Sequence, residues 1–393
     1  MDVTGFSTER LSRINNLMNR YVDSGKLAGA VTCVARRSQV AHFESFGCQN
    51  LETQIPMRRD SIFRICSMTK PITSLALMML YEEALFNLTD AVSQYIPAFK
   101  HVKVWGVTGA LETPVRPITI QDLLCHTAGL SYGGYVDSHS PIDKLYDEAD
   151  LFNTKITNAE VTARIARLPL MFHPGTKWHY SMATDVIGYL VEVLSDRPLA
   201  DLMQEKIFAV LGMEDTAFEI EPAKLSRFCT LYGKTPDSNF AVLDLPDSSQ
   251  YLPPVALHSG GSGLVSTAGD YLQFAQCILN KGELDGVRLL GPKTIALMTC
   301  NHLPLTLLPI SFEGIEPMFG MGFGLGFGVM LDPAHAGMMG SVGDHGWGGY
   351  AETYFWIDPH EELIAILMSQ YLPSQTYPIR KEFRTAVYQA LID

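Results

Sequence analysis

Ser67-Met68-Thr69-Lys70 is the only S-x-x-K sequence in the chain. Residues three apart on a helix share a face, so the serine hydroxyl and the lysine amine are expected to be neighbours. A serine hydroxyl is a poor nucleophile until a base takes its proton, and a lysine can do so when burial or nearby cations lower its pKa. The pair therefore predicts nucleophilic catalysis at Ser67, against the alternative of an ordinary surface serine and lysine.

The flanking residues predict that this pair lies where a strand meets a helix. The run 62–66, Ile-Phe-Arg-Ile-Cys, is strand-like, and a long apolar helix is expected from Thr73 to about Leu85. Pro71 suits the first turn of a helix, where its missing N–H is not needed. Ser67 would then lie near the positive end of the helix dipole, which favours a developing oxyanion.

The rest of the chain predicts the frame that holds this junction. An amphipathic helix is expected over 7–24, and the runs Gly29–Ala35 and Val40–Phe46 indicate a hairpin. Residues 76–225 are mostly helical in pattern, and strands return after Gly260. Other expected elements are helices at 120–127, 183–194, 268–279 and the last twenty residues, strands at 322–331, 350–358 and 363–370, and an irregular segment at 230–260.

This order of elements predicts an α+β fold, a sandwich in which an antiparallel sheet built from both chain ends is flanked by helices. Residues 1–75 and 230–393 would form the discontinuous sheet domain. Residues 76–229 would form an inserted, mainly helical domain, with the active site in the cleft between the two.

Composition and charge exclude several classes of protein. The 393 residues include 42 acidic and 29 basic ones, and no Lys/Arg run exceeds the pairs Arg36-Arg37 and Arg58-Arg59, which argues against a nucleic-acid partner. The seven cysteines form no C-x-x-C pair and fit a reducing compartment. Signal-peptide and membrane-span patterns are not found. We therefore expect a cytoplasmic protein with no membrane partner.

The histidines do not have the spacing of a metal site. No H-E-x-x-H pattern or other metal spacing occurs, so we expect no metal. Nucleophilic catalysis at Ser67 needs no cofactor, so none is expected. His126 and His173 are expected to have structural roles.

Four segments, in order along the chain, resemble the serine β-lactamase and penicillin-binding-protein superfamily. They are the nucleophile segment 63–73 (FRICSMTKPIT), the segment 123–130 (LLCHTAGL), the segment 174–181 (PGTKWHYS) and the glycine-rich segment 260–267 (GGSGLVST). The resemblance covers roughly residues 7–370 and implies a β-lactamase-like fold.

The resemblance implies roles for particular residues. Ser67, Lys70 and Tyr180 would be catalytic, because the family places a second base or proton shuttle at the position of Tyr180; a core tyrosine is the alternative. A phenol between a lysine and a serine can pass the proton to a leaving alcohol. The backbone N–H groups of Ser67 and Tyr350 would form the oxyanion hole.

Two departures from the family pattern bear on the substrate. Penicillin-recognising members have Y-x-N and K-T-G, whereas this chain has Tyr180-Ser181-Met182 and, just before the strand expected at 350–358, Trp347-Gly348-Gly349. A W-G-G segment resembles the class-C-like carboxylesterases, called family VIII esterases, and a related acyltransferase. The substrate-binding residues would be Trp347, Gly348, Gly349, Tyr132 and His345. For His345, a structural role is an equal alternative.

These residues and the resemblance together predict a serine carboxylesterase, with a small-molecule ester as substrate and an acyl-enzyme on Ser67. Short-chain or aromatic esters are expected, because Trp347 and Tyr132 favour apolar groups. The alternatives are a β-lactamase or D-aminopeptidase-type amide hydrolase, an acyltransferase of the same superfamily, and a non-catalytic binding protein on the same fold.

A second candidate nucleophile is weaker. The segment 129–133, Gly-Leu-Ser-Tyr-Gly, matches the G-x-S-x-G nucleophile elbow, which requires a strand before it and a helix directly after. A short helix is expected before it and no helix after it. Ser131 is therefore not favoured as the nucleophile.

Overall fold

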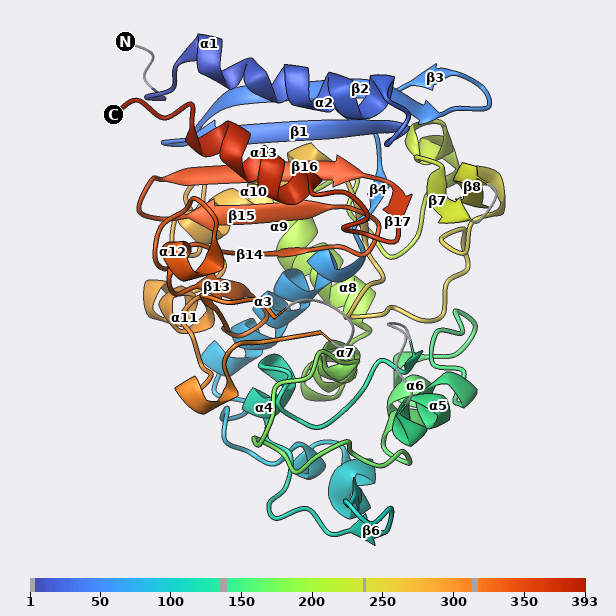
Figure 1. Cartoon of the computed structure of the whole chain (residues 1–393). Helices are drawn as coiled ribbons and strands as arrows, with labels where there is room; N and C mark the ends of the chain where they lie inside the picture. Colours follow the sequence, from blue (N-terminus) through green and yellow to red (C-terminus); the bar gives the residue numbers. More distant parts are fainter. Residues whose placement is uncertain (1–3, 135–139, 236–237, 313–316) are drawn as a thin grey trace.

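A computed structural model describes residues 4–134, 140–235, 238–312 and 317–393. In the described part of the chain, one large antiparallel sheet has the strand order β12-β13-β14-β15-β16-β1-β2-β3 (Figure 1). Its strands are β1 (Gly29–Arg36), β2 (Gln39–Asn50), β3 (Ile55–Pro56), β12 (Met321–Phe323), β13 (Gly328–Met330), β14 (His345–Gly348), β15 (Tyr354–Asp358) and β16 (Leu363–Ser369).

The two ends of the chain meet in the middle of this sheet. β1 pairs with β16, with Ala30 opposite Ser369, and with β2, with Ala30 opposite Phe46. Arg37 and Ser38 connect β1 to β2 with φ of 53° and 59°, the left-handed conformation that closes a two-residue hairpin. Both the hairpin and the sheet built from both chain ends are confirmed.

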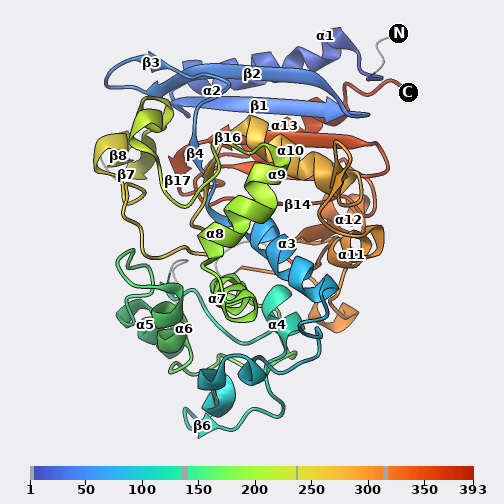
Figure 2. The same ribbon diagram turned by 180° about the vertical axis from the view of Figure 1, so that it is seen from behind.

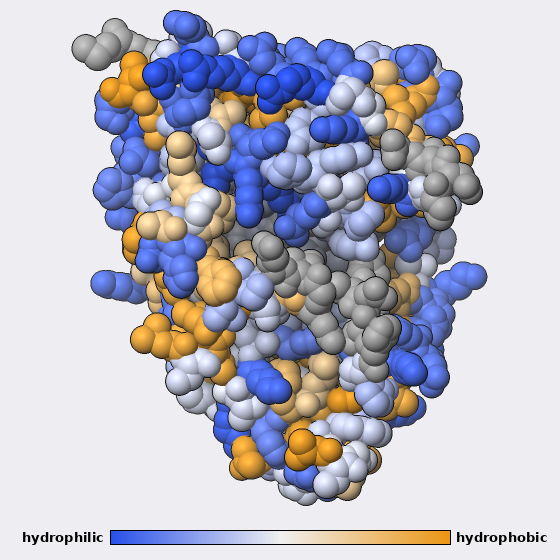
Figure 3. Space-filling model, in the orientation of Figure 1, coloured by the Kyte–Doolittle hydropathy of each residue, from blue (hydrophilic) through white to orange (hydrophobic). Residues whose placement is uncertain are grey.

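Helices cover both faces of the sheet. On one face lie α1 (Thr8–Leu11), α2 (Arg13–Asp23) and α13 (Ile379–Tyr388), and on the other lies α10 (Ala268–Leu279), seen from behind in Figure 2. α2 turns Ile14, Leu17 and Met18 toward the sheet. The outer side of α1 and α2 is strongly hydrophilic, as the upper edge of Figure 3 shows.

The first helix is interrupted, whereas a continuous helix was expected over 7–24. Ser12 ends α1 and begins α2, and its hydroxyl donates to the carbonyl oxygen of Glu9 at 2.7 Å. A serine that bonds to nearby backbone competes with the regular helical pattern, which accounts for the break.

Below the sheet, α3 (Thr69–Glu82) runs through the largest hydrophobic core. Nearly all of its residues are buried, and it packs against α7 (Ala183–Ser195), which also contacts α4 and α6. The remaining α-helices in the described residues are α4 (Ile120–Leu124), α5 (Pro141–Glu148), α6 (Asn158–Ile165), α8 (Leu199–Met203), α9 (Ala209–Leu211), α11 (Pro292–Met298) and α12 (Pro333–Ala336). The chain thus places a mainly helical middle against the sheet.

α4 begins as predicted and ends early. Thr119 and Asp122 form a complete capping box at its start. The helix stops at Leu124 rather than near Thr127, because His126 has a φ of 57° and cannot continue it. The expected helices at 268–279 and 183–194 match α10 and α7 closely.

Three strand expectations need correction. The segment 230–260 is not irregular throughout, because β7 (Leu231–Thr235) and β8 (Ser238–Asp244) form a hairpin beside β17 (Tyr371–Leu372). The strand expected at 322–331 is two strands, β12 and β13, that reverse at Gly326, whose φ is 92°. The strand expected at 350–358 begins only at Tyr354, so Trp347 and Gly348 lie inside the preceding strand, β14.

Short strand pairs complete the described structure. They are β4 (Phe63–Arg64) with β9 (Val265–Ser266), β5 (Val104–Trp105) with β6 (Leu111–Glu112), and β10 (Glu283–Leu284) with β11 (Val287–Arg288).

Within the described residues, no helix is both long and apolar enough to cross a membrane. The predicted domain boundaries remain a prediction, and α3 crosses the one at residue 75.

Candidate active site

Ser67 lies at the junction that the sequence predicted. β4 pairs with β9 and ends at Arg64, and a short 3-10 helix, Cys66–Met68, leads directly into α3. Cys66 has a φ of 45°, a strained conformation for a residue with a side chain, of the kind that gathers at functional sites. Ser67 is therefore held in a sharp turn at the start of the buried helix.

Lys70 has no exposed surface and makes three hydrogen bonds. Its Nζ lies 3.3 Å from the Ser67 hydroxyl oxygen, 2.8 Å from the Tyr132 hydroxyl oxygen and 2.7 Å from the Gly261 carbonyl oxygen. These three acceptors match the three N–H groups of an ammonium. The i, i+3 spacing thus brings the serine and the lysine together, as predicted.

Tyr180 lies beside this pair with its ring, rather than its hydroxyl, toward the lysine. The Lys70 Nζ is 4.7 Å from the centroid of the Tyr180 ring. The Tyr180 hydroxyl oxygen accepts a hydrogen bond of 3.0 Å from the Trp347 indole N–H. Two tyrosines therefore surround the Lys70 ammonium, and it is Tyr132 whose hydroxyl the lysine contacts.

The loop after α4 positions Tyr132. Gly129, with a φ of 85°, passes so close to the Phe172 carbonyl that a side chain there would overlap it. Ser131 is fully buried, donates to the Asp143 carboxylate and accepts from the Gly133 N–H at 3.0 Å. The G-x-S-x-G serine is thus hydrogen-bonded inside the loop, which follows a helix rather than a strand.

The W-G-G segment lies against the nucleophile turn. β14 carries Trp347 and Gly348, and the backbone N–H groups of Tyr350 and Ala351 face the Cys66 thiol. Burial raises the pKa of that thiol, although these N–H groups oppose the rise. The backbone of Tyr350 therefore borders the turn that holds Ser67, and its role in the oxyanion hole remains a prediction.

Gly349 accounts for this close approach. A Cβ atom at Gly349 would overlap the carbonyl oxygen of Ile65 and the hydroxyl of Thr353. At Gly348 the same atom would meet the Arg380 guanidinium. The two predicted substrate-binding glycines thus allow β14 and its following turn to pack against their neighbours.

His345 lies in the core of the fold. Its side chain is 2% exposed, its Nδ1 donates to the Gly343 carbonyl oxygen at 3.0 Å, and its ring meets the Phe327 ring. Burial lowers the pKa of His345 to about 4. The contacts described for it do not include Ser67, Lys70 or Tyr180, so its pocket role remains a prediction.

His126 lies closer to the site than its expected structural role suggests. Its ring centroid is 4.7 Å from that of Tyr180, and its Nδ1 lies 3.3 Å from the Ser181 hydroxyl oxygen. Burial lowers its pKa well below the usual range, so the ring is neutral near pH 7. His173 is partly exposed and accepts from the Val115 N–H at 3.3 Å.

Aromatic side chains that the sequence analysis did not single out surround Tyr180 and Trp347. Ring centroids of Phe312 and Trp178 lie 5.1 and 6.2 Å from that of Tyr180, and the Phe323 centroid lies 5.1 Å from that of Trp347. Phe152 stacks on Tyr132 at 6.3 Å. Trp178 could have been inferred from its place two residues before Tyr180, but no local pattern marks Phe312 or Phe323.

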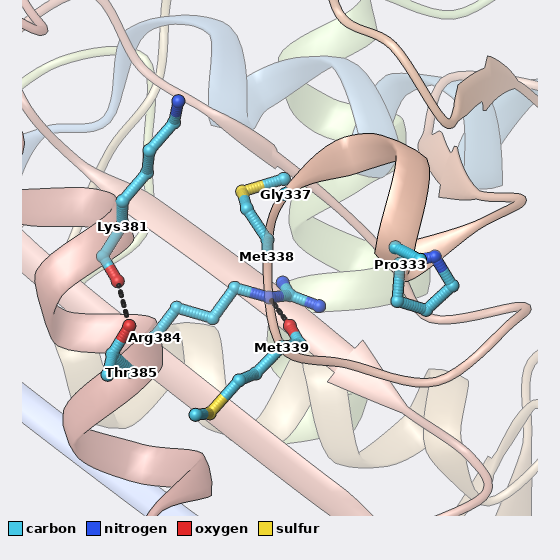
Figure 4. A pocket seen from close by; sticks show the side chains of 8 residues that line it. Pro333, Gly337, Met338, Met339, Lys381, Arg384 and Thr385 are labelled. Carbon is cyan, nitrogen blue, oxygen red and sulfur yellow. Dashed lines mark hydrogen bonds between the residues drawn. The ribbon is translucent and has the colours of Figure 1, made fainter.

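A cavity of about 440 Å³ between α12 and α13 is a separate feature (Figure 4). Met338, Met339 and Lys381 help to line it, and Arg384 crosses it. The Arg384 guanidinium donates to the Met339 carbonyl oxygen and to the Asp344 carboxylate. Because its one buried cation is paired and none of the predicted site residues lines it, we do not place the site there.

The described residues contain no group of three His, Cys, Asp or Glu side chains placed to hold a metal ion.

The fold and the serine–lysine pair at the start of α3 define a class, the serine β-lactamase-like proteins. The family model described as Beta-lactamase matches residues 14–389, and the chain belongs to this family.

Individual relatives are similar along almost the whole chain. Protein Rv1367c of Mycobacterium tuberculosis is 34% identical over 89% of this chain and 88% of its own length. Esterase EstB of Burkholderia gladioli is 30% identical over 99% of this chain and 98% of its own length. Among solved structures, EstCE1, described as a hydrolase with promiscuous acyltransferase activity, has a TM-score of 0.82 at 27% identity, over 97% of this chain and 99% of its own.

Proposed function

We propose that this chain is a serine carboxylesterase that hydrolyses short-chain or aromatic esters through an acyl-enzyme on Ser67. The observation that carries the proposal is the 3.3 Å contact between Ser67 Oγ and the Nζ of Lys70, a lysine with no exposed surface. A buried amine beside a serine hydroxyl is the arrangement that activates a nucleophile. The similarity to Esterase EstB supports the same reading.

Acylation would begin when Ser67 Oγ attacks the ester carbonyl carbon. The hydroxyl proton passes to neutral Lys70, directly or through a phenol, as the Oγ–C bond forms and the carbonyl electron pair moves to oxygen. The backbone N–H groups of Ser67 and Tyr350 would hold this oxyanion. The bond to the alcohol oxygen then breaks as the Tyr180 hydroxyl gives its proton to the leaving alcohol. The proton that Lys70 took from Ser67 passes to the Tyr180 oxygen, so both groups return to their starting forms.

Deacylation reverses these roles with water as the nucleophile. The lysine and phenol take a proton from water as its oxygen attacks the acyl carbonyl. The tetrahedral intermediate then collapses, the Ser67 oxygen leaves and recovers its proton, and the carboxylic acid is released. No electron donor or acceptor is required.

The site's surroundings support a neutral, apolar substrate. Trp347 stands where penicillin-recognising relatives have a lysine, and its indole N–H is used by the Tyr180 hydroxyl. Phe312 and Phe323 add apolar surface beside it. A substrate carboxylate would find no cation in the W-G-G segment itself, which disfavours the β-lactamase and peptidase alternatives.

A second candidate is acyl transfer to an alcohol other than water. The description of EstCE1 as a hydrolase with promiscuous acyltransferase activity favours it. The acyl-enzyme on Ser67 would be the same, and the acceptor alcohol would replace water in the second step.

The test compares p-nitrophenyl butyrate with nitrocefin on the wild type and on two variants, Ser67→Ala and Ser131→Ala. We expect ester cleavage to exceed nitrocefin cleavage, and we expect Ser67→Ala to abolish it. Ser131→Ala loses a buried hydrogen bond and should be less stable, yet it should still turn over the ester.

Other results would point elsewhere. If Ser131→Ala is folded but inactive while Ser67→Ala is active, Ser67 is not the nucleophile. Faster turnover of nitrocefin would favour the amide hydrolase. If an added alcohol takes most of the acyl group at the expense of hydrolysis, the acyltransferase reading replaces the esterase. A wild type that cleaves neither compound and is not labelled by a fluorophosphonate would favour a non-catalytic protein.

A further inference from the structure

The third hydrogen bond of Lys70 leads to a buried carboxyl group. Gly261, whose carbonyl oxygen accepts from Nζ at 2.7 Å, belongs to a turn at 259–263. The Gly261 N–H donates to Asp185 Oδ1 at 3.1 Å, and the Ser259 hydroxyl donates to the same oxygen at 2.5 Å. Asp185 projects from α7 and is 5% exposed.

The position of the Gly261 carbonyl depends on this carboxyl group. A Cβ atom at Gly261 would overlap Asp185 Oδ2, so both carboxyl oxygens lie against the turn. The turn is also closed by a hydrogen bond of 2.9 Å from the Gly263 N–H to the Ser259 carbonyl oxygen. Thr73, one turn beyond Lys70 on α3, donates to the Gly260 carbonyl at 2.7 Å. The turn thus joins α7 to the two residues of α3 that face it.

We propose that Asp185 is a positioning residue for Lys70: its carboxylate fixes the 259–263 turn, aims the Gly261 carbonyl at Nζ and balances the charge of the buried ammonium. The inference rests on the proposed function, in which Lys70 takes the proton of Ser67. It adds a residue that touches neither the substrate nor Ser67 and acts through the lysine.

Other titratable groups face Lys70 in the part of the chain that the structure describes: the phenols of Tyr132 and Tyr180, the thiol of Cys66 and the ring of His126. The thiol and the ring do not supply this balance near pH 7. Burial raises the pKa of the thiol and lowers that of the imidazole, so both stay neutral. Burial also raises the pKa of Asp185, and the Lys70 charge opposes that rise.

The decisive variant is Asp185→Asn, which keeps the shape and an acceptor oxygen but removes the negative charge. Loss of the Asp185 charge makes a positive charge at the site less favourable. With p-nitrophenyl butyrate, the acid limb of the kcat/KM profile should move down by about one pH unit. The plateau kcat should fall about tenfold, because the lysine is held less precisely.

A matched control lies two turns along the same helix. Glu192 also has a pKa raised by burial, and its carboxylate accepts from the Asn158 amide at 2.9 Å and the Leu199 N–H at 3.1 Å. Glu192→Gln should leave the acid limb where it is in the wild type. Ser259→Ala, which removes one donor but keeps the Asp185 charge, should lower kcat several-fold without moving the limb.

A folded Asp185→Asn protein with an unmoved acid limb would overturn the proposal, as would an equal shift in Glu192→Gln. Thermal melting and fluorophosphonate labelling show whether each variant is folded. Should Asp185→Asn not fold, an unchanged kcat in Ser259→Ala would overturn the proposal instead. Failure of the proposed function itself is distinct, since Ser67→Ala would then retain the wild-type rate.

Discussion

The ammonium of Lys70 donates to the hydroxyl of Tyr132, with 2.8 Å between Nζ and the phenolic oxygen. The family resemblance gives the proton-shuttle role to Tyr180, whose ring faces the same ammonium and whose hydroxyl is bound by Trp347. Two phenols are thus in reach of one lysine, and single substitutions can separate their roles.

We expect Tyr180→Phe to lower kcat by about 10²–10⁴, the usual contribution of a general acid–base group. Tyr132→Phe should lower kcat less, by about tenfold, because it removes one neutral acceptor of the ammonium and leaves the leaving-group proton donor in place. Single-turnover kinetics with p-nitrophenyl butyrate measure both. A Tyr132→Phe variant that is the more impaired of the two would transfer the shuttle role to Tyr132.

The pairing of Ser67 with Lys70 could be predicted because it is local. A spacing of three residues across the 3-10 turn and the start of α3 puts both side chains on one face, and the strand-to-helix pattern around them is strong. The partner of the lysine could not be predicted in the same way. Tyr132 and Gly261 come from loops 62 and 191 residues away along the chain, and only tertiary packing brings them to Nζ.

The same distinction explains the rest of the fold. The β1–β2 hairpin and α10 follow from short-range patterns and were predicted, whereas the β7–β8 hairpin was missed because its strands lie in a segment interrupted by polar and proline residues. Asp185 was also missed. An acidic residue in a helix is usually exposed, and only its packing against the 259–263 turn shows that this one is buried.

His345 should make the free energy of unfolding depend on pH. Its folded pKa of about 4 lies below the unfolded value of about 6.5, so the unfolded state alone binds a proton between these values. This stabilising contribution is complete above about pH 6.5 and is lost as the pH falls toward 4. His345→Asn keeps a donor for Gly343 and removes the titration.

Urea unfolding at pH 7 and pH 5 measures this effect. Between pH 7 and pH 5, the free energy of unfolding of the wild type should fall by about 2 kcal/mol more than that of His345→Asn. The other histidines contribute equally to both proteins, so the difference belongs to His345. Equal losses in the two proteins would mean that His345 takes up its proton without unfolding.

Gly349 should be as necessary to catalysis as a residue that touches the substrate. In Gly349→Ala, the new methyl group would overlap the Ile65 carbonyl and the Thr353 hydroxyl, so the end of β14 must move away from the nucleophile turn. The predicted oxyanion donor at Tyr350 would move with it. A displacement of about 1 Å in a catalytic group lowers the rate by about 10²-fold, and we expect a loss in kcat of that size.

A glycine elsewhere provides the control for this change. Gly269 lies in the first turn of α10, and a Cβ atom there would meet nothing closer than the Thr267 hydroxyl at 3.7 Å. Gly269→Ala should keep the wild-type kcat and raise the melting temperature slightly, because alanine favours a helix over glycine. If Gly349→Ala retains full kcat and a normal melting temperature, the close packing of β14 on the turn does not position the oxyanion donor, and the hole must be built from other N–H groups.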